Sequence, residues 1–118
     1  MSAAEYLDMQ RARAEIVAEL NRRTDGFDAV LSPTVPILAP RISDVANSVD
    51  EYRRVNMLLL RNTSVFNFLD GCALSIPCHA EGEAPVGLML AAPRLKDKAL
   101  LSIGLAVEQV VAPPIRSY

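Results

Sequence analysis

Hydrophobic and polar side chains follow a helical period in the first fifth of the chain. Residues 3–23 contain no Gly or Pro, and apolar side chains recur on one face at helical spacing. Ser2 and Glu5 have the spacing of a capping box, so the pattern predicts a helix that begins at Ala3 and stops before Gly26. The apolar stripe consists of Ala3, Leu7, Ala14 and Val17, and Tyr6, Met9, Ile16 and Leu20 widen it.

Short apolar runs elsewhere have the length and the boundaries of β-strands. Residues 73–76 and 86–92 flank a polar turn at residues 81–83, and each run is bounded by Pro or Gly. The second run would place apolar side chains on both faces, which is typical of a strand covered by helices on both sides. Another short run, residues 28–31, must end at Pro33 because proline has no backbone donor.

The segments between and after these strands predict one loop and three helical stretches. Residues 32–49 contain several prolines and predict a long loop, and loops of that length are often functional. Ser48 is a suitable N-cap for a helix from about Val49 to Arg61, and Val65–Leu69 predicts one further helical turn.

The final predicted helix, residues 97–111, is apolar around nearly its whole circumference. A helix of this kind is normally buried on more than one side. Pro113 and Pro114 would end it, leaving residues 115–118 as a tail.

This order of elements predicts an α/β layered fold rather than a bundle or a sandwich. We expect about three short strands in a mixed sheet, covered by about three helices. The sequence contains no internal repeat and no linker, so residues 1–118 are expected to form a single segment.

Composition and residue spacing argue against several classes of function. The net charge of −2 provides no basic patch for a nucleic acid, and no apolar run approaches the roughly 20 residues of a membrane helix. No secretory signal is recognisable, so a cytoplasmic protein is expected. Cys72 and Cys78 lack the spacing of a redox pair or a metal site, and His79 is the single histidine. Neither a metal nor a cofactor is expected.

The sequence contains no complete catalytic motif. A GxSxG elbow, a glycine-rich phosphate loop and an HExxH pair are all absent. Cys78 and His79 suggest a cysteine-dependent enzyme as a minor alternative, although adjacent strand residues point to opposite faces. The hydroxyl groups of Ser32 and Thr34 follow a strand end, where clefts of α/β folds lie, but a turn-forming role fits them equally well.

Five motifs in order resemble the C-terminal portion of the amidase signature family of serine amidohydrolases. A strand followed by Pro-Thr and a second Pro occupies residues 28–36, and an Asn-Thr-Ser-x-Phe-Asn segment occupies residues 62–67. An apolar-Ser-apolar-Pro strand follows at residues 73–77, and a Pro-Val-Gly-Leu-like strand lies within residues 84–90. The last motif, residues 97–108, is a helix that opens after an acidic residue.

The resemblance implies hydrolysis of carboxylic amide C–N bonds by a catalytic Ser, a bridging cis-Ser and a Lys. In the family these residues lie N-terminal to the matching region, and no residue here matches them. Lys96 and Lys98 are the only lysines and are not assigned a catalytic role. The resemblance therefore implies a C-terminal amidase fragment without catalytic residues, inactive alone, whose partner is the missing N-terminal region and whose full enzyme takes a small amide.

By position, the same resemblance implies that two segments form part of the substrate-pocket wall. An alternative is that Asn62 and Asn67 only satisfy backbone groups around a broken helix. Many family members have Gly-x-Pro at the position of residues 70–72, where this chain has Asp-Gly-Cys. This form resembles a subset of the family that includes allophanate-hydrolase-like amidases. The wall candidates are Pro33, Thr34, Pro36, Arg61, Asn62 and Phe66.

A second hypothesis comes from a different class of protein. The final helix and the two-sided strand expose more apolar surface than so short a chain covers easily. A stand-alone α/β module that self-associates without catalysis would cover this surface by symmetry.

Overall fold

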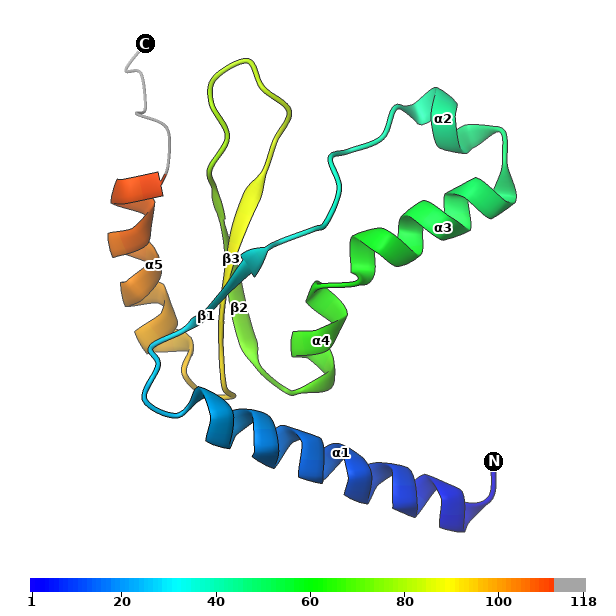
Figure 1. Cartoon of the computed structure of the whole chain (residues 1–118), viewed down its shortest axis with the longest axis vertical. Coiled ribbons are helices and arrows are strands. Elements are labelled where there is room, and N and C mark those ends of the chain that lie inside the picture. Colours follow the sequence, from blue (N-terminus) through cyan, green and yellow to red (C-terminus); the bar gives the residue numbers. More distant parts are fainter. Residues whose placement is uncertain (112–118) are drawn as a thin grey trace.

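The computed structural model describes residues 1–111 of the chain, and the expectations for Pro113, Pro114 and residues 115–118 lie outside them. Helices and strands are arranged as an α/β fold (Figure 1). The elements are α1 (Ala3–Thr24), β1 (Val30–Pro33), α2 (Ile42–Ala46), α3 (Val49–Leu60), α4 (Thr63–Phe68), β2 (Cys72–Pro77), β3 (Gly87–Ala92) and α5 (Asp97–Val111).

Three strands form one sheet in the order β1-β3-β2, with β3 at the centre. Both pairings are antiparallel, so the mixed pairing expected from the sequence is not found within residues 1–111. The register places Ser32 opposite Met89, and Met89 opposite Ser75. Side chains that are directly opposite lie on one face of a sheet, so these three share a face.

Helix α5 covers the first face of the sheet and completes the main hydrophobic core. Leu90 of β3 is fully buried there, together with Ile76 and Leu100. Gly104 allows the close approach of α5, because a Cβ at this position would lie 2.8 Å from Cδ2 of Leu74. The helix and the central strand are thus held together by apolar contact rather than by polar groups.

The second face of β3 is also covered. Met89 and Ala91 are buried there, and Leu20 of α1 lines a narrow crevice together with Phe66, Leu69 and Ala91. The prediction that residues 86–92 form a strand buried on both faces is therefore confirmed for β3. Strand β2 behaves differently, because its second-face residues Ala73, Ser75 and Pro77 are exposed.

The described part of the chain buries α5 on one side, although a helix apolar around its circumference is normally buried on more than one. Leu100 and Gly104 are its buried residues, whereas Leu101, Leu105 and Val110 are 62%, 65% and 83% exposed. The described part of the chain has no further layer outside α5. Apolar residues around a whole helix thus indicate that the helix is stabilised by burial, but they do not identify the element that buries it.

The predicted loop at residues 32–49 contains one short helix, α2, and the remaining helix predictions are confirmed. The Ser48 hydroxyl accepts a hydrogen bond from the Glu51 amide over 3.2 Å, as expected for the N-cap of α3. The capping box of α1 is also present, since the Glu5 amide donates to Ser2 Oγ over 3.2 Å and the Ser2 amide donates to Glu5.

The molecule is open rather than compact. Its radius of gyration is 17.7 Å, whereas a compact chain of this length has about 13–14 Å. Its accessible surface is 9096 Å², against about 6,300 Å² for a compact monomer of this mass. Helix α1 and the α2–α3 arm project from the sheet (Figure 1), and none of the 22 residues of α1 is buried.

Candidate functional site

The end of β1 is fixed by an amide side chain from the junction of α3 and α4. Asn62 Nδ2 donates a hydrogen bond of 2.8 Å to the carbonyl oxygen of Pro33, 29 residues away in the sequence. Asn62 occupies the N-cap position of α4 but makes no capping hydrogen bond. Its side chain is therefore used to hold the strand end to the helical layer.

Two hydroxyl groups meet over the central strand next to this contact. Thr34 Oγ1 and Ser75 Oγ share a hydrogen bond 2.5 Å long, and the Thr34 amide donates to the carbonyl oxygen of Gly87 over 2.8 Å. A Cβ on Gly87 would collide with Ser75 Oγ and would lie 2.8 Å from Thr34 Oγ1. The missing side chain of Gly87 is what allows the hydroxyl pair to form.

Arg61 is linked to the same group of residues. Its Nε donates to Asn62 Oδ1 over 3.2 Å, so the Asn62 side chain accepts from Arg61 and donates to Pro33. The guanidinium is exposed and has no carboxylate at ion-pair distance within residues 1–111. We call the group formed by Pro33, Thr34, Arg61, Asn62, Ser75 and Gly87 the strand-end patch.

Pro36 borders the strand-end patch from the loop after β1. It lies in a shallow hollow of about 200 Å³ whose other walls are Val35, Ile37, Leu38 and residues 85–87. Gly87 belongs both to this hollow and to the strand-end patch, so apolar side chains lie beside the hydroxyl pair.

Phe66 lies apart from the other five wall candidates. It lines a crevice between α1, α4 and the sheet, together with Leu20, Leu69 and Ala91. The structure therefore brings Pro33, Thr34, Arg61 and Asn62 together, with Pro36 at their edge, and leaves Phe66 elsewhere.

Sequence reasoning did not single out Ser75 or Gly87. A signal for Ser75 is present, because a serine in the middle of an apolar strand requires a hydrogen-bond partner or solvent. Ser32 lies on the same sheet face, and its hydroxyl oxygen is buried without a protein partner among the described residues. The pairing of Ser75 with Thr34 depends on strand register, which the sequence pattern does not specify.

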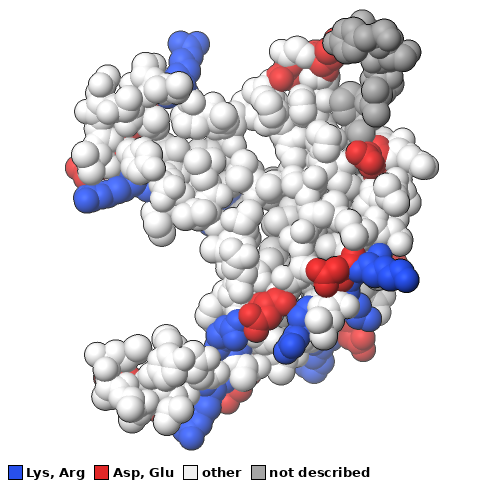
Figure 2. Space-filling model, turned by 180° about the vertical axis from the view of Figure 1, so that it is seen from behind, with Lys and Arg blue, Asp and Glu red and all other residues white. Residues whose placement is uncertain are grey.

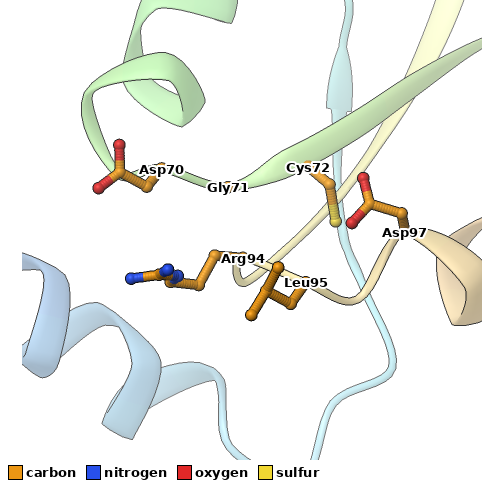
Figure 3. Close-up of a pocket in the computed structure, with 6 residues that line it drawn as sticks. All are labelled: Asp70, Gly71, Cys72, Arg94, Leu95 and Asp97. Carbon is orange, nitrogen blue, oxygen red and sulfur yellow. The ribbon is translucent and has the colours of Figure 1, made fainter.

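A second hollow of about 310 Å³ lies at the opposite end of the sheet, between the start of β2 and the start of α5 (Figure 3). The Arg94 side chain extends away from Asp97, while Asp97 points toward Cys72. The Cys72 thiol donates to the carbonyl oxygen of Pro93 over 3.4 Å. Asp70 and Leu95 adopt left-handed backbone conformations, with φ of 54° and 65°. Charged groups do not converge here on a common point.

Cys78 and His79 do not form a catalytic pair in this structure. The Cys78 thiol donates to the carbonyl oxygen of Val86 over 3.7 Å, and His79 Nδ1 lies 3.4 Å from the same oxygen. Each side chain thus contacts the backbone of the neighbouring strand end. Within residues 1–111, no three His, Cys, Asp or Glu side chains gather closely enough to hold a metal ion.

Comparisons with known proteins agree with the fold. The sequence model of the family described as Amidase matches residues 1–101. A 2-amino-5-chloromuconic acid deaminase from Comamonas testosteroni is 34% identical over 112 residues, which are 94% of this chain and 24% of that protein. A glutamyl-tRNA(Gln) amidotransferase subunit from Saccharolobus solfataricus is 36% identical over 104 residues, or 88% of this chain and 21% of that protein.

A solved structure has the same fold. The crystal structure of the corresponding glutamyl-tRNA(Gln) amidotransferase subunit from Thermotoga maritima superposes with a TM-score of 0.72 at 25% sequence identity. The superposition covers 97% of this chain and 24% of that one. The chain therefore spans about a quarter of the length of the relatives it matches. In the described part of the chain, no helix has the length and hydropathy needed to cross a membrane.

Proposed function

From the premise that this chain belongs to the amidase family, we propose that it forms the C-terminal part of an amidase domain. The complete domain converts a small carboxylic amide and water into an acid and an amine. This chain contributes strands, core and part of the pocket wall, and the catalytic Ser, cis-Ser and Lys belong to the remaining part of the domain.

The proposal rests on the strand-end patch. Hydrogen bonds hold its polar side chains in place, but the patch lacks the groups for catalysis. The Thr34 and Ser75 hydroxyls hydrogen-bond to each other rather than to a base. Lys96 and Lys98 follow the far end of β3, which lies roughly 17 Å along the strand from Gly87. Activation of a nucleophile requires a base within hydrogen-bond reach, so this chain is proposed to hold the substrate rather than to attack it.

The strand-end patch has the features of a pocket wall. Asn62 fixes the Pro33 carbonyl, which sets the course of the loop that carries Pro36. Arg61 has guanidinium N–H groups that form no ion pair with a carboxylate of residues 1–111. Binding sites commonly combine apolar walls with a few placed polar groups, and this patch offers both.

A chimera tests the proposal. Residues 1–111 of this chain replace the matched quarter of the Comamonas testosteroni protein, and both deamination of 2-amino-5-chloromuconic acid and amide hydrolysis are measured for the chimera and for the 118-residue chain alone. We expect activity from the chimera and none from the chain alone. In the chimera, Asn62→Ala is expected to lower kcat/KM, while Lys98→Ala, at an exposed position outside the patch, is expected to leave it unchanged. A folded chimera without activity, or hydrolysis by the chain alone, would contradict the proposal.

Self-association is a second candidate function, favoured by the exposed Leu101, Leu105 and Val110 on α5. Copies that cover this helix by symmetry would form a non-catalytic assembly. Sedimentation equilibrium of the chain and of a Leu101→Lys, Leu105→Lys variant tests it, since only an assembly through α5 becomes monomeric on substitution.

A further inference from the structure

Arg61 differs from most arginines of residues 1–111 in how its charge is balanced. Six arginines form ion pairs with carboxylates, and five of these pairs join residues three or four positions apart on one helix. The sixth joins Arg13 of α1 to Asp70 over 2.7 Å, with the Arg13 guanidinium also over the Phe68 ring. Arg61 has no local pair of this kind, because no position three or four residues away holds an acidic side chain.

The Arg61 guanidinium is held by a neutral group instead. Its Nε donates to Asn62 Oδ1 over 3.2 Å, and Asn62 Nδ2 donates to the carbonyl oxygen of Pro33 over 2.8 Å. The backbone is also fixed, since the Arg61 carbonyl oxygen accepts from Ser64 Oγ over 3.2 Å. Among residues 1–111, the two Nη groups have no hydrogen-bond partner. The protein thus orients a planar pair of N–H donors without pairing them internally.

The surroundings of Arg61 in the strand-end patch are neutral. The Thr34 and Ser75 hydroxyls hydrogen-bond to each other, and such a pair retains one hydrogen that it can donate. Seen from behind, the surface where the α2–α3 arm joins the sheet shows few charged side chains (Figure 2). Arg61 carries the single formal charge of the patch as defined above, so no acidic member of the patch weakens its attraction for an anion.

The donor geometry and the neighbouring hollow define the chemistry of the ligand. A guanidinium fork matches the two oxygens of a carboxylate, to which it can donate two parallel hydrogen bonds. The hollow beside Gly87 has a volume of about 200 Å³ and apolar walls that include Pro36 and Leu38. Such walls suit a short hydrocarbon chain rather than a second charged group. The patch therefore combines a carboxylate-binding end with an apolar path.

We infer that Arg61 is a specificity-determining residue that binds a carboxylate of the substrate, and that Asn62 is the positioning residue that orients its guanidinium. This inference rests on the proposed function. The substrate class is then the monoamides of short dicarboxylic acids. The carboxylate binds the Nη groups of Arg61, the linking carbons lie along the hollow lined by Pro36, and the amide faces the part of the domain that supplies the nucleophile.

Two matched amides test this inference in the chimera with the Comamonas testosteroni protein. Succinamate carries a carboxylate where succinamide carries a second neutral amide. We expect a lower KM for succinamate. Arg61→Gln is expected to raise the KM for succinamate about tenfold or more, because it removes a charge-assisted hydrogen bond. The KM for succinamide is expected to change by less than about twofold. Arg61→Lys keeps the charge but not the fork, so it is expected to restore part of the preference.

The control is Arg94→Gln. Arg94 is an exposed arginine at the opposite end of the sheet, and its substitution is expected to leave both KM values unchanged. Asn62→Ala tests the positioning role. It is expected to raise the KM for succinamate when Arg61 is present and to have no further effect on the preference in the Arg61→Gln variant, because the two residues act as one unit.

The opposite results overturn the inference. Arg61 also ends α3, where a positive charge favours the helix dipole. If that were its role, Arg61→Gln would lower thermal stability and change the KM of both amides alike. Equal KM values for succinamate and succinamide in the unsubstituted chimera would also contradict carboxylate binding.

Calorimetric titration separates this inference from the proposed function. A folded chimera without activity contradicts the proposed function alone, and the same chimera is then titrated with succinamate and with succinamide. Tighter binding of succinamate that Arg61→Gln abolishes would still support the carboxylate site. Equal affinity for the two amides would overturn it, whether or not the chimera is active.

Discussion

The central strand and the first helix of this molecule are both apolar in pattern, yet they differ completely in burial. In β3, residues 89–92 are all buried, with α5 packed on one face of the strand. In α1, none of the 22 residues is buried, although apolar side chains recur along it at helical spacing. An apolar face therefore indicates that a segment is stabilised by burial, and the neighbouring elements determine whether it is buried.

The largest expected effect is at the centre of the core. Leu90→Ala removes a fully buried side chain and leaves a cavity between β3 and α5, so the free energy of unfolding is expected to fall by about 2–5 kcal/mol. Leu7→Ala, the same substitution on α1 where the side chain is 55% exposed, is expected to change it by less than about 0.5 kcal/mol. Urea unfolding measures both, and equal effects would remove the contrast between the two regions.

A smaller effect is expected where Gly87 lies beneath the Thr34–Ser75 pair. Gly87→Ala forces the two hydroxyls apart and is expected to cost about 1–3 kcal/mol in the free energy of unfolding. Combining it with Ser75→Ala removes the colliding oxygen, so the double variant is expected to recover part of the loss. Additive single effects in this cycle would mean that the collision is relieved by another movement.

The contact between α1 and the rest of the molecule is expected to be weaker still. Arg13→Ala removes a half-exposed ion pair and a cation–π contact, so the free energy of unfolding is expected to fall by no more than about 1 kcal/mol. Arg11→Ala, whose ion pair lies within α1, is the matched control. Amide exchange at residues 14–20 is expected to accelerate for Arg13→Ala alone.

The smallest expected effect concerns pH. Hydrogen bonds from Arg22, and then from Arg23, hold the pKa of Glu19 below its ordinary value. Because the pKa is lowered in the helix, this contribution to α1 is present above the ordinary glutamate pKa and is lost as pH falls through the lowered value. Carboxyl titration by NMR is expected to show a higher Glu19 pKa in an Arg22→Ala, Arg23→Ala variant. An unchanged titration would mean that the pairs do not form in solution.

Local signals predicted most of the secondary structure correctly. Ser2 with Glu5, Ser48 and Gly26 mark helix boundaries through short-range hydrogen bonds and backbone preferences, which act within one turn. Helix α2 was missed because five residues present too little periodicity within a proline-rich segment. The strand pairing was expected to be mixed, and its antiparallel form depends on long-range contacts that no local pattern encodes.

Some residues of the candidate site could likewise be predicted from the sequence, whereas others depend on long-range contacts. A resemblance between motifs pointed to Pro33, Thr34 and Asn62, and the structure joins these residues through the Asn62–Pro33 hydrogen bond. The partner of Thr34 is 41 residues away, on a strand that meets it only across β3. The same resemblance implies a place for Phe66 in the pocket wall, but Phe66 lines the crevice between α1, α4 and the sheet.

Residue types at short spacing are enough to predict the strands, every described helix except α2, the amphipathic pattern of α1 and the family resemblance. The covered apolar faces, the hydroxyl pair over Gly87 and the contact of Arg13 that orients α1 toward α4 follow only from the folded arrangement. Burial and side-chain pairing depend on distances between elements, and contacts between residues far apart in the chain set those distances.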